Sequence, residues 1–368
     1  MTELPIALSG APARIRPAPG KGVTSVAHVP QAWYVACLSR ELGQRQVLAR
    51  TVLGLPIVLF RTQSGKVGAF LDRCPHRNVP LSLGAVEGDS LRCAYHGWRF
   101  DTEGECREVP CLVGDPGGPA RRADAFPVRE QDGWIWVYAT PGAEPEVEPY
   151  DLPTRGDRRY TTVLDVVEAA GSLHAVAENA LDVPHTAFLH KGLFRGVSEP
   201  NDISVVVRDW GDRVEAEYIG EPAPKGLAGR ILGMGSSATV QHFDRFFLPC
   251  LAQVEYKLGD TSHFLVTSAM TPLGDHQTRI FAAISFRLPL PGLLVRLVLT
   301  PIARRIFAQD AVILAQQAEN LRRFGGEQFA SSDVDALGQQ IQRLLKSAER
   351  GAVERFDEPR EKRFQMKV

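Results

Sequence analysis

Four residues on two short segments have the types and spacing of a metal site. A cysteine and a histidine are separated by one residue in CPHR and by two residues in CAYHGW, which gives the set Cys74, His76, Cys93 and His96. A thiolate and an imidazole this close together can reach one metal from the tip of a tight loop, and two such loops supply four ligands. Pro75 stiffens the first loop, and Gly97 allows the close backbone approach that a cluster with inorganic sulfides requires. The pattern favours a 2Fe-2S cluster, with a structural zinc site as the alternative.

A second group of candidate ligands lies in ENALDVPHTAFLH, residues 178–190. On a helix, Asn179, Asp182 and His185 are three residues apart and share one face, so that a carboxylate stands beside an imidazole. His190 follows a proline, and we expect it to reach the same point from beyond the helix end. Two histidines with one carboxylate form the facial triad of non-haem iron enzymes that activate oxygen. The alternative is two unrelated histidines in the core or on the surface.

The carboxylate of such a triad is expected on the segment RRIFAQDAVILAQQAENLRRF. At about 100° per residue, one helix face collects an otherwise largely apolar stripe: Ile306, Asp310, Ile313, Leu314, Gln317 and Leu321. A buried, unpaired carboxylate is costly, so Asp310 requires a metal or another partner. Glu319 lies about 180° around the helix and points away. Asp310 is therefore the predicted third ligand, and a buried salt bridge is the alternative.

The elements that position these residues divide the chain into two halves that differ in their sequence pattern. Short apolar runs with Gly, Pro, Asp and Asn between them fill residues 33–138 and predict a small all-β domain. The second half combines strand-like runs over 203–287 with partly helical residues 161–189 and helical patterns over 301–324 and 332–349. The expected fold class is α+β, with an antiparallel sheet flanked by helices in the second half.

A Pro- and Glu-rich segment, residues 141–153, marks the expected domain boundary. The predicted organisation is therefore an N-terminal arm (1–29), a metal-cluster domain (30–142), a mononuclear metal domain (143–355) and a C-terminal tail (356–368).

Composition indicates an ordinary globular protein. The chain has 368 residues, 44% hydrophobic and 23% charged, and its formal net charge of -1 gives no preference for nucleic acid. Six cysteines are too sparse for a secreted disulfide scaffold, and the N-terminus lacks a signal-peptide pattern, so a cytoplasmic location is expected. The most apolar stretch, residues 288–299, is interrupted by Pro, Gly and Arg and is shorter than the roughly 20 residues of a membrane span. We expect it to be buried or to dock on a surface.

Both metal patterns resemble segments of one family, the Rieske non-haem iron oxygenases. CPHR, CAYHGWRFD and the strand-like GWIWV (133–137) are similar to that family's Rieske domain, and N-x2-D-x2-H-x4-H is similar to its mononuclear iron segment. The resemblance implies a helix-grip-like catalytic fold, a 2Fe-2S cluster on the two Cys/His pairs, and Fe(II) on His185, His190 and Asp310. It also implies that Asn179 lies near the iron. In the family, the residue matching Asp182 bridges one subunit's cluster to the neighbour's iron, which implies a homotrimer.

The implied activity is that of an oxygenase component. It would use O2 to hydroxylate, demethylate or desaturate a hydrophobic or aromatic small molecule, as the types built from a single kind of subunit often do. The glycine-rich GMGSSA (233–238) is too weak a signal for a nucleotide site, so electrons are expected from a separate reductase or ferredoxin. Three alternatives remain: a ring-dihydroxylating dioxygenase, an electron-transfer protein with an inert catalytic domain, and a peripheral membrane enzyme acting on a lipid or pigment.

Overall fold

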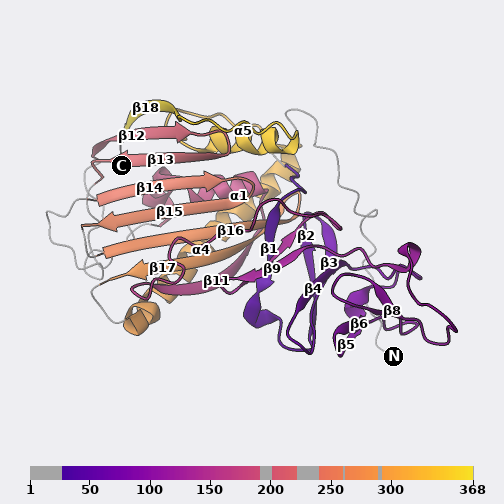
Figure 1. The fold of residues 1–368 in the computed structure, drawn as a ribbon. Coiled ribbons are helices and arrows are strands. Elements are labelled where there is room, and N and C mark those ends of the chain that lie inside the picture. Colours follow the sequence, from indigo (N-terminus) through magenta and orange to yellow (C-terminus); the bar gives the residue numbers. More distant parts are fainter. Residues whose placement is uncertain (1–26, 191–200, 222–239, 260–261, 289–291, 368) are drawn as a thin grey trace.

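The computed structural model describes residues 27–190, 201–221, 240–259, 262–288 and 292–367. The glycine-rich segment 233–238 and nearly all of the predicted N-terminal arm lie outside these residues. An all-β domain and a larger sheet-and-helix domain stand side by side (Figure 1). The predicted α+β class is confirmed.

The N-terminal domain consists of three small antiparallel sheets, ordered β1-β10-β9, β2-β3-β4 and β5-β6-β7-β8. Its strands are β1 (Trp33–Leu38), β2 (Val47–Val52), β3 (Leu55–Arg61), β4 (Val67–Leu71), β5 (Ala85–Glu87), β6 (Ser90–Arg92), β7 (Arg99–Phe100), β8 (Cys106–Glu108), β9 (Val128–Gln131) and β10 (Trp134–Tyr138). Local turn chemistry sets the register. Leu53 and Gly54 (φ 51° and 76°) form the two-residue turn whose twist suits the hairpin of β2 and β3.

The second domain is one eight-stranded antiparallel sheet in the order β11-β17-β16-β15-β14-β13-β12-β18. Its strands are β11 (Thr161–Ala169), β12 (Asp202–Asp209), β13 (Arg213–Ile219), β14 (Val240–Phe247), β15 (Leu251–Leu258), β16 (Ser262–Gly274), β17 (Gln277–Arg287) and β18 (Arg360–Lys367). Strict alternation of buried and half-buried residues along β13 is the pattern of a strand with one face on the core. The strand-like runs predicted over 203–287 are confirmed.

Helices cover one face of this sheet (Figure 1). They are α1 (Leu173–Ala180), α2 (Val183–Leu189), α4 (Gly292–Phe324) and α5 (Gly338–Glu349). α1 packs on β15, β16 and β17, α4 on β11, and α5 on β13. The opposite face meets the N-terminal domain, where Trp33, Trp134 and Trp136 share a core with Phe281 of β17. In the described part of the chain, no helix has the length and apolarity to cross a membrane.

Three boundaries differ from the sequence prediction. α4 begins nine residues before Pro301, because buried Val295 packs against β11 and β17 and this contact outweighs the missing proline N–H. α5 begins at Gly338 and not at Ser332, whose N–H and hydroxyl bind Asp335 in a preceding turn. The predicted C-terminal tail was wrong for residues 360–367, since β18 pairs with β12 along its whole length and forms the sheet edge.

Candidate metal centres

The two Cys/His loops of the N-terminal domain have the same backbone geometry. In each loop the cysteine N–H donates to the carbonyl five residues later, from Cys74 to Val79 (2.9 Å) and from Cys93 to Trp98 (2.8 Å). Both cysteines are 2% exposed and lie in the core of this domain. The fold therefore holds two sulfur atoms inside and presents the rest of each loop outward.

The fourth residue after each cysteine adopts a left-handed conformation. It is Asn78 in the first loop (φ 60°) and Gly97 in the second (φ 73°). Asparagine tolerates this conformation and glycine favours it. A Cβ at position 97 would also lie 3.0 Å from Pro110 Cγ, so both the backbone angle and the available space favour glycine.

The two histidines lie together at the loop tips. The ring centroids of His76 and His96 are 4.5 Å apart, and the His76 ring stacks on Trp98 at 4.6 Å. His76 Nδ1 is buried and has no hydrogen-bond partner, which suits a metal ligand. Desolvation and the charges of Arg77 and His96 lower the pKa of His76, so the neutral, ligating form is favoured.

The sulfur of Cys74 requires a positive partner to ionise. Burial raises the pKa of Cys74 to about 11, so the thiol is protonated at neutral pH without a metal. A metal that binds as the thiolate forms supplies the missing charge. Two buried sulfurs and two nitrogens near the surface fit a cluster with cysteines on the inner iron and histidines on the outer one.

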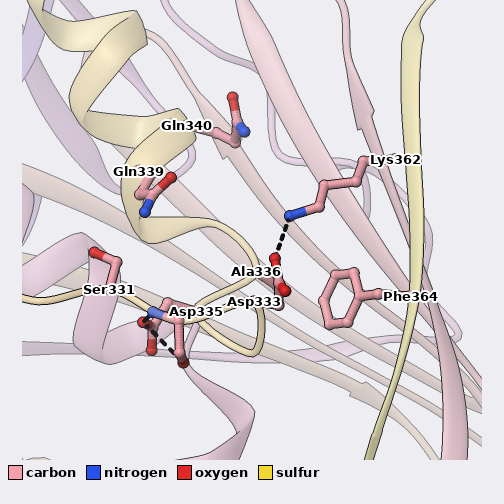
Figure 2. A pocket seen from close by; sticks show the side chains of 9 residues that line it. Ser331, Asp333, Asp335, Ala336, Gln339, Gln340, Lys362 and Phe364 are labelled. Atoms are coloured by element: carbon pink, nitrogen blue, oxygen red, sulfur yellow. Dashed lines mark hydrogen bonds and ion pairs between the residues drawn. The ribbon is translucent and has the colours of Figure 1, made fainter.

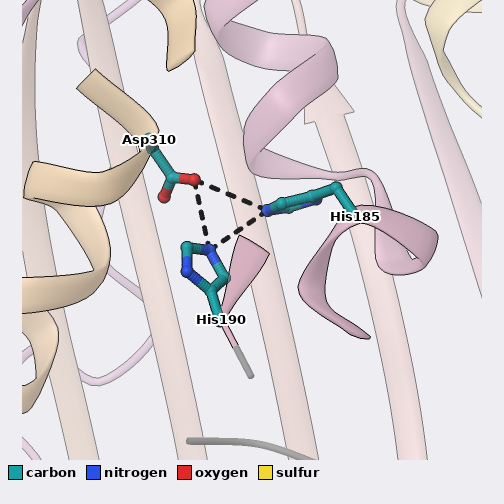
Figure 3. Close-up of side chains that lie close together, drawn as sticks. All are labelled: His185, His190 and Asp310. Carbon is teal, nitrogen blue, oxygen red and sulfur yellow. Dashed lines mark hydrogen bonds and ion pairs between the residues drawn. The ribbon is translucent and has the colours of Figure 1, made fainter. Parts of the chain in front are cut away.

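A second convergence of ligands lies between α2 and α4 (Figure 3). His190 Nε2 is 3.1 Å from Asp310 Oδ1 and 3.2 Å from His185 Nε2, and His185 Nε2 is 3.6 Å from Asp310 Oδ1. Asp310 Oδ1 is buried and makes no hydrogen bond of good geometry. All three ligand atoms face one point, and this is the only such group of His, Cys, Asp or Glu side chains found in the described residues. The set fits a metal that prefers nitrogen and oxygen ligands.

A helix break positions the two histidines. α1 ends at Ala180, and Asp182 is the N-cap of α2, where its Oδ2 accepts the His185 N–H at 3.3 Å. His190 is the C-cap of the same short helix, and its N–H donates to Thr186 O. The predicted single helix face through residues 179, 182 and 185 was wrong, because α1 ends between the first two. The predicted position of His190, just past a helix end, is confirmed.

Asp182 also holds the His185 ring. Its carbonyl oxygen is hydrogen-bonded to His185 Nδ1, and its Oδ2 is 3.5 Å from the same atom. Burial alone lowers the pKa of His185, but Asp182 and Asp310 outweigh it and raise this pKa to about 9 in the metal-free site. Asn179 lies on the last turn of α1 and contributes its carbonyl to the turn that leads to Asp182.

Asp310 lies on the buried side of α4, but the stripe around it is rotated relative to the prediction. Leu314 and Ala318 are buried, whereas Ile313 is 47% exposed and Gln317 is exposed. The predicted wheel placed Ile313 at the centre of the inward face. In the structure, Leu314 and Ala318 face inward, so the buried face is shifted by one residue toward the C-terminus. Glu319 is exposed and paired with Arg322, as expected for a residue that points away.

Sequence reasoning missed Gln309. Its Oε1 is 2.9 Å from His190 Nδ1, the ring nitrogen that does not face the ligand set. With a metal on Nε2, Nδ1 carries the hydrogen and donates it to Gln309, which fixes the tautomer. In the sequence, Gln309 could have been identified as a candidate site residue by its position directly before Asp310.

His242 belongs to neither of the two ligand patterns found in the sequence. This side chain is 1% exposed on β14 and is stacked between Tyr218 and Tyr256 on the neighbouring strands. Its ring nitrogens lie 2.6 Å from Glu221 Oε2 and 3.1 Å from Asp244 Oδ1. Burial lowers its pKa, but the two carboxylates outweigh burial and raise it to about 9. This network gives His242 a structural role.

A polar pocket lies elsewhere, between the start of α5 and β18 (Figure 2). Its lining includes Ser331, Asp335, Gln339 and Lys362, and it shares no residue with either metal-ligand set. It is therefore separate from the two candidate centres.

Comparison with known families accounts for both centres. The Rieske 2Fe-2S domain family matches residues 32–124, which contain both Cys/His loops, and the family of the vanillate O-demethylase oxygenase C-terminal domain matches residues 170–351, which contain His185, His190 and Asp310. The chain belongs to the Rieske oxygenase family. It combines the cluster domain and the catalytic domain of these enzymes in the order that the family resemblance implied.

Individual relatives agree with this membership. The chain is 38% identical over 170 residues to the oxygenase component of dicamba O-demethylase from Stenotrophomonas maltophilia, covering 44% of this chain and 48% of that protein. It is 27% identical over 345 residues to the vanillate O-demethylase oxygenase subunit from Pseudomonas sp., covering 85% and 93%. The chain spans about half the length of the first curated relatives it matches.

Solved structures extend the likeness over both domains. Dicamba monooxygenase bound to 3,6-dichlorosalicylic acid has a TM-score of 0.76 at 26% identity, covering 90% of this chain and all of that one. A related structure of that enzyme contains a non-haem iron. The matched Rieske family is that of a 2Fe-2S domain, and the convergent His185, His190 and Asp310 fit a mononuclear iron.

Proposed function

We propose that the chain is the oxygenase component of a Rieske non-haem iron system. It uses O2 and electrons from a separate reductase or ferredoxin to hydroxylate or demethylate a hydrophobic or aromatic small molecule. One observation carries the proposal: the ligand atoms of His185 and His190, at α2, and of Asp310, on α4, lie within 4.8 Å of one another. A protein that only transferred electrons would not need this second ligand set beside a cluster domain.

The proposed ligands are Cys74, His76, Cys93 and His96 for the cluster and His185, His190 and Asp310 for the mononuclear iron. When bound, the cluster transfers single electrons and the mononuclear iron binds and activates dioxygen. Because the protein supplies three ligands, a bound iron would keep coordination positions available for dioxygen. Asp182 fixes the His185 ring and Gln309 fixes the His190 ring, so both imidazoles present Nε2 to the same point.

Asp182 has a second proposed role between subunits, with the homotrimer as the assembly. Its side chain is 31% exposed, so the carboxylate can reach a neighbouring molecule while it still caps α2. The cluster histidines His76 and His96 lie at the outer tips of their loops and suit such a contact. Asn179 is proposed to support this turn near the iron.

The proposed substrate is aromatic or otherwise hydrophobic. Dicamba O-demethylase and a putative toluene-4-sulfonate monooxygenase subunit from Comamonas testosteroni, at 38% and 37% identity, support an aromatic substrate by their names. A 4β-methylsterol monooxygenase from Methylococcus capsulatus, 37% identical over 165 residues, supports a bulkier one. Demethylation or hydroxylation is favoured over ring dihydroxylation, and the cytoplasm is the proposed location.

Iron analysis and oxygen uptake test the proposal together. We expect three irons per chain, substrate-dependent oxygen uptake with a surrogate reductase, and products that contain one atom of labelled oxygen or have lost a methyl group. His185→Ala should remove one iron and the uptake while it leaves the cluster spectrum intact. Two irons per chain would instead indicate an electron-transfer protein, and one zinc would exclude both functions.

A further inference from the structure

The first turns of α4 expose leucine side chains. Leu293, Leu294 and Leu297 are 70%, 57% and 66% exposed, whereas Val295 between them is 2% exposed. Val295 packs in a core cluster with Ile284 and other residues of the sheet. This part of the helix is therefore apolar on its inward and on its outward face. Exposed apolar surface of this kind marks an interaction site.

Two exposed arginines lie along the same helix as the leucine strip. At roughly 100° per residue from Val295, Leu293 and Leu297 lie about 160° and 200° away, directly opposite the core. Arg296 directly precedes Leu297, and Arg305 follows Leu297 by eight residues, about 12 Å along the helix axis. Both arginines are exposed.

The whole segment is basic. Between Asp275 and Asp310 the sequence contains no Asp or Glu and five arginines: Arg279, Arg287, Arg296, Arg304 and Arg305. Arg304 is 65% exposed and is paired with Asp165 of β11 at 2.8 Å. Arg279 is paired with Glu168. Among the arginines of α4, Arg296 and Arg305 are exposed and supply positive charge beside the leucines.

We propose that this face of α4 docks on the surface of a membrane with anionic phospholipids. The leucines enter the boundary between headgroups and acyl chains, and Arg296 and Arg305 extend to the phosphates. A strip of leucine with long cationic side chains on the same helix is typical of helices that lie in a membrane interface. The surrounding positive charge complements an anionic leaflet. A protein partner without interfacial water would instead have to bury these guanidinium groups and provide carboxylates at matching positions to pair with them.

The site places the catalytic domain at the membrane without a spanning segment. Leu297 is thirteen residues before Asp310, which is about 20 Å along the helix axis. The docked surface and the proposed iron ligand therefore share one helix, and an apolar substrate could be taken from the bilayer. The docking proposal does not depend on the proposed oxygenase activity.

Vesicle flotation of the full-length holoprotein tests the docking. We expect binding to vesicles of phosphatidylcholine mixed with phosphatidylglycerol, weaker binding to phosphatidylcholine alone, and a decrease with added salt. L293Q and L297Q, made as single variants, should each lower the partition coefficient for anionic vesicles about tenfold. R296Q with R305Q should reduce the preference for anionic vesicles about fivefold per arginine.

The control is F324Q, which removes an exposed aromatic residue (68%) at the other end of α4 and should leave binding unchanged. Absence of wild-type binding to both kinds of vesicle overturns the proposal. So does a leucine variant that binds vesicles normally but has a lower oligomeric mass in sedimentation, because this face would then be an interface between copies of the chain.

Discussion

The contact between Gln309 and His190 gives a prediction that isolates one hydrogen bond of the mononuclear site. Gln309→Met removes the acceptor at 2.9 Å and keeps the length and helix propensity of the side chain. The buried Nδ1–H then loses this acceptor, and the ring can adopt the other tautomer, which no longer presents a lone pair on Nε2. The variant should bind Fe(II) more weakly.

The expected size follows from the burial of the ring. Loss of an outer hydrogen-bond partner of a metal ligand costs about 10- to 100-fold in affinity, or roughly 1.4 to 2.7 kcal/mol. His190 is only 1% exposed, so bulk water cannot easily replace the glutamine oxygen. We therefore expect a loss near the upper end of this range. Gln309→Glu keeps an acceptor and should retain most of the affinity.

Anaerobic competition between the protein and a chromophoric Fe(II) chelator measures this affinity. The absorbance of the 2Fe-2S cluster serves as an internal control, since the proposed cluster ligands Cys74 and Cys93 lie in the other domain. Gln316→Met is the matched variant, because Gln316 is exposed on the same helix. An unchanged Fe(II) affinity in Gln309→Met, or an equal loss in Gln316→Met, would refute the assigned role.

Three further predictions concern the other networks. Asp182→Ala should keep both iron centres by metal analysis yet lose turnover, and normal turnover would exclude the proposed bridge between subunits. Cys93→Ser should lower the iron content from the three expected per chain to one and abolish the cluster spectrum; retention of that spectrum would contradict the ligand assignment. His242→Gln should destabilise the fold by about 3 to 5 kcal/mol at pH 7, because it leaves Glu221 and Asp244 buried without their cation. Since the folded pKa of His242 is raised to about 9, its stabilisation is complete below about pH 6.5 and is lost as the pH rises through 9; equal urea midpoints across that interval would refute this.

Local patterns in the sequence predicted most of the architecture. Period-two alternation and turn residues identified the strands of both domains, and the spacing of the Cys/His pairs identified the two loops. These features succeed because their physical causes act over a few residues. Predictions of boundaries were weaker. The start of α4 and the pairing of β18 depend on Val295 and on strand β12, which are distant contacts that no local pattern encodes.

The candidate iron site was also predictable in part from the sequence and in part only from the structure. The sequence by itself determined the types of its ligands, because two imidazoles and one carboxylate at characteristic positions already define the chemistry. Only the tertiary structure decided how they meet. The break between α1 and α2 turns His185 and His190 toward α4, and Gln309 fixes His190 from that helix. These contacts join residues far apart in the chain, and their geometry results from the packing of the helices on the sheet.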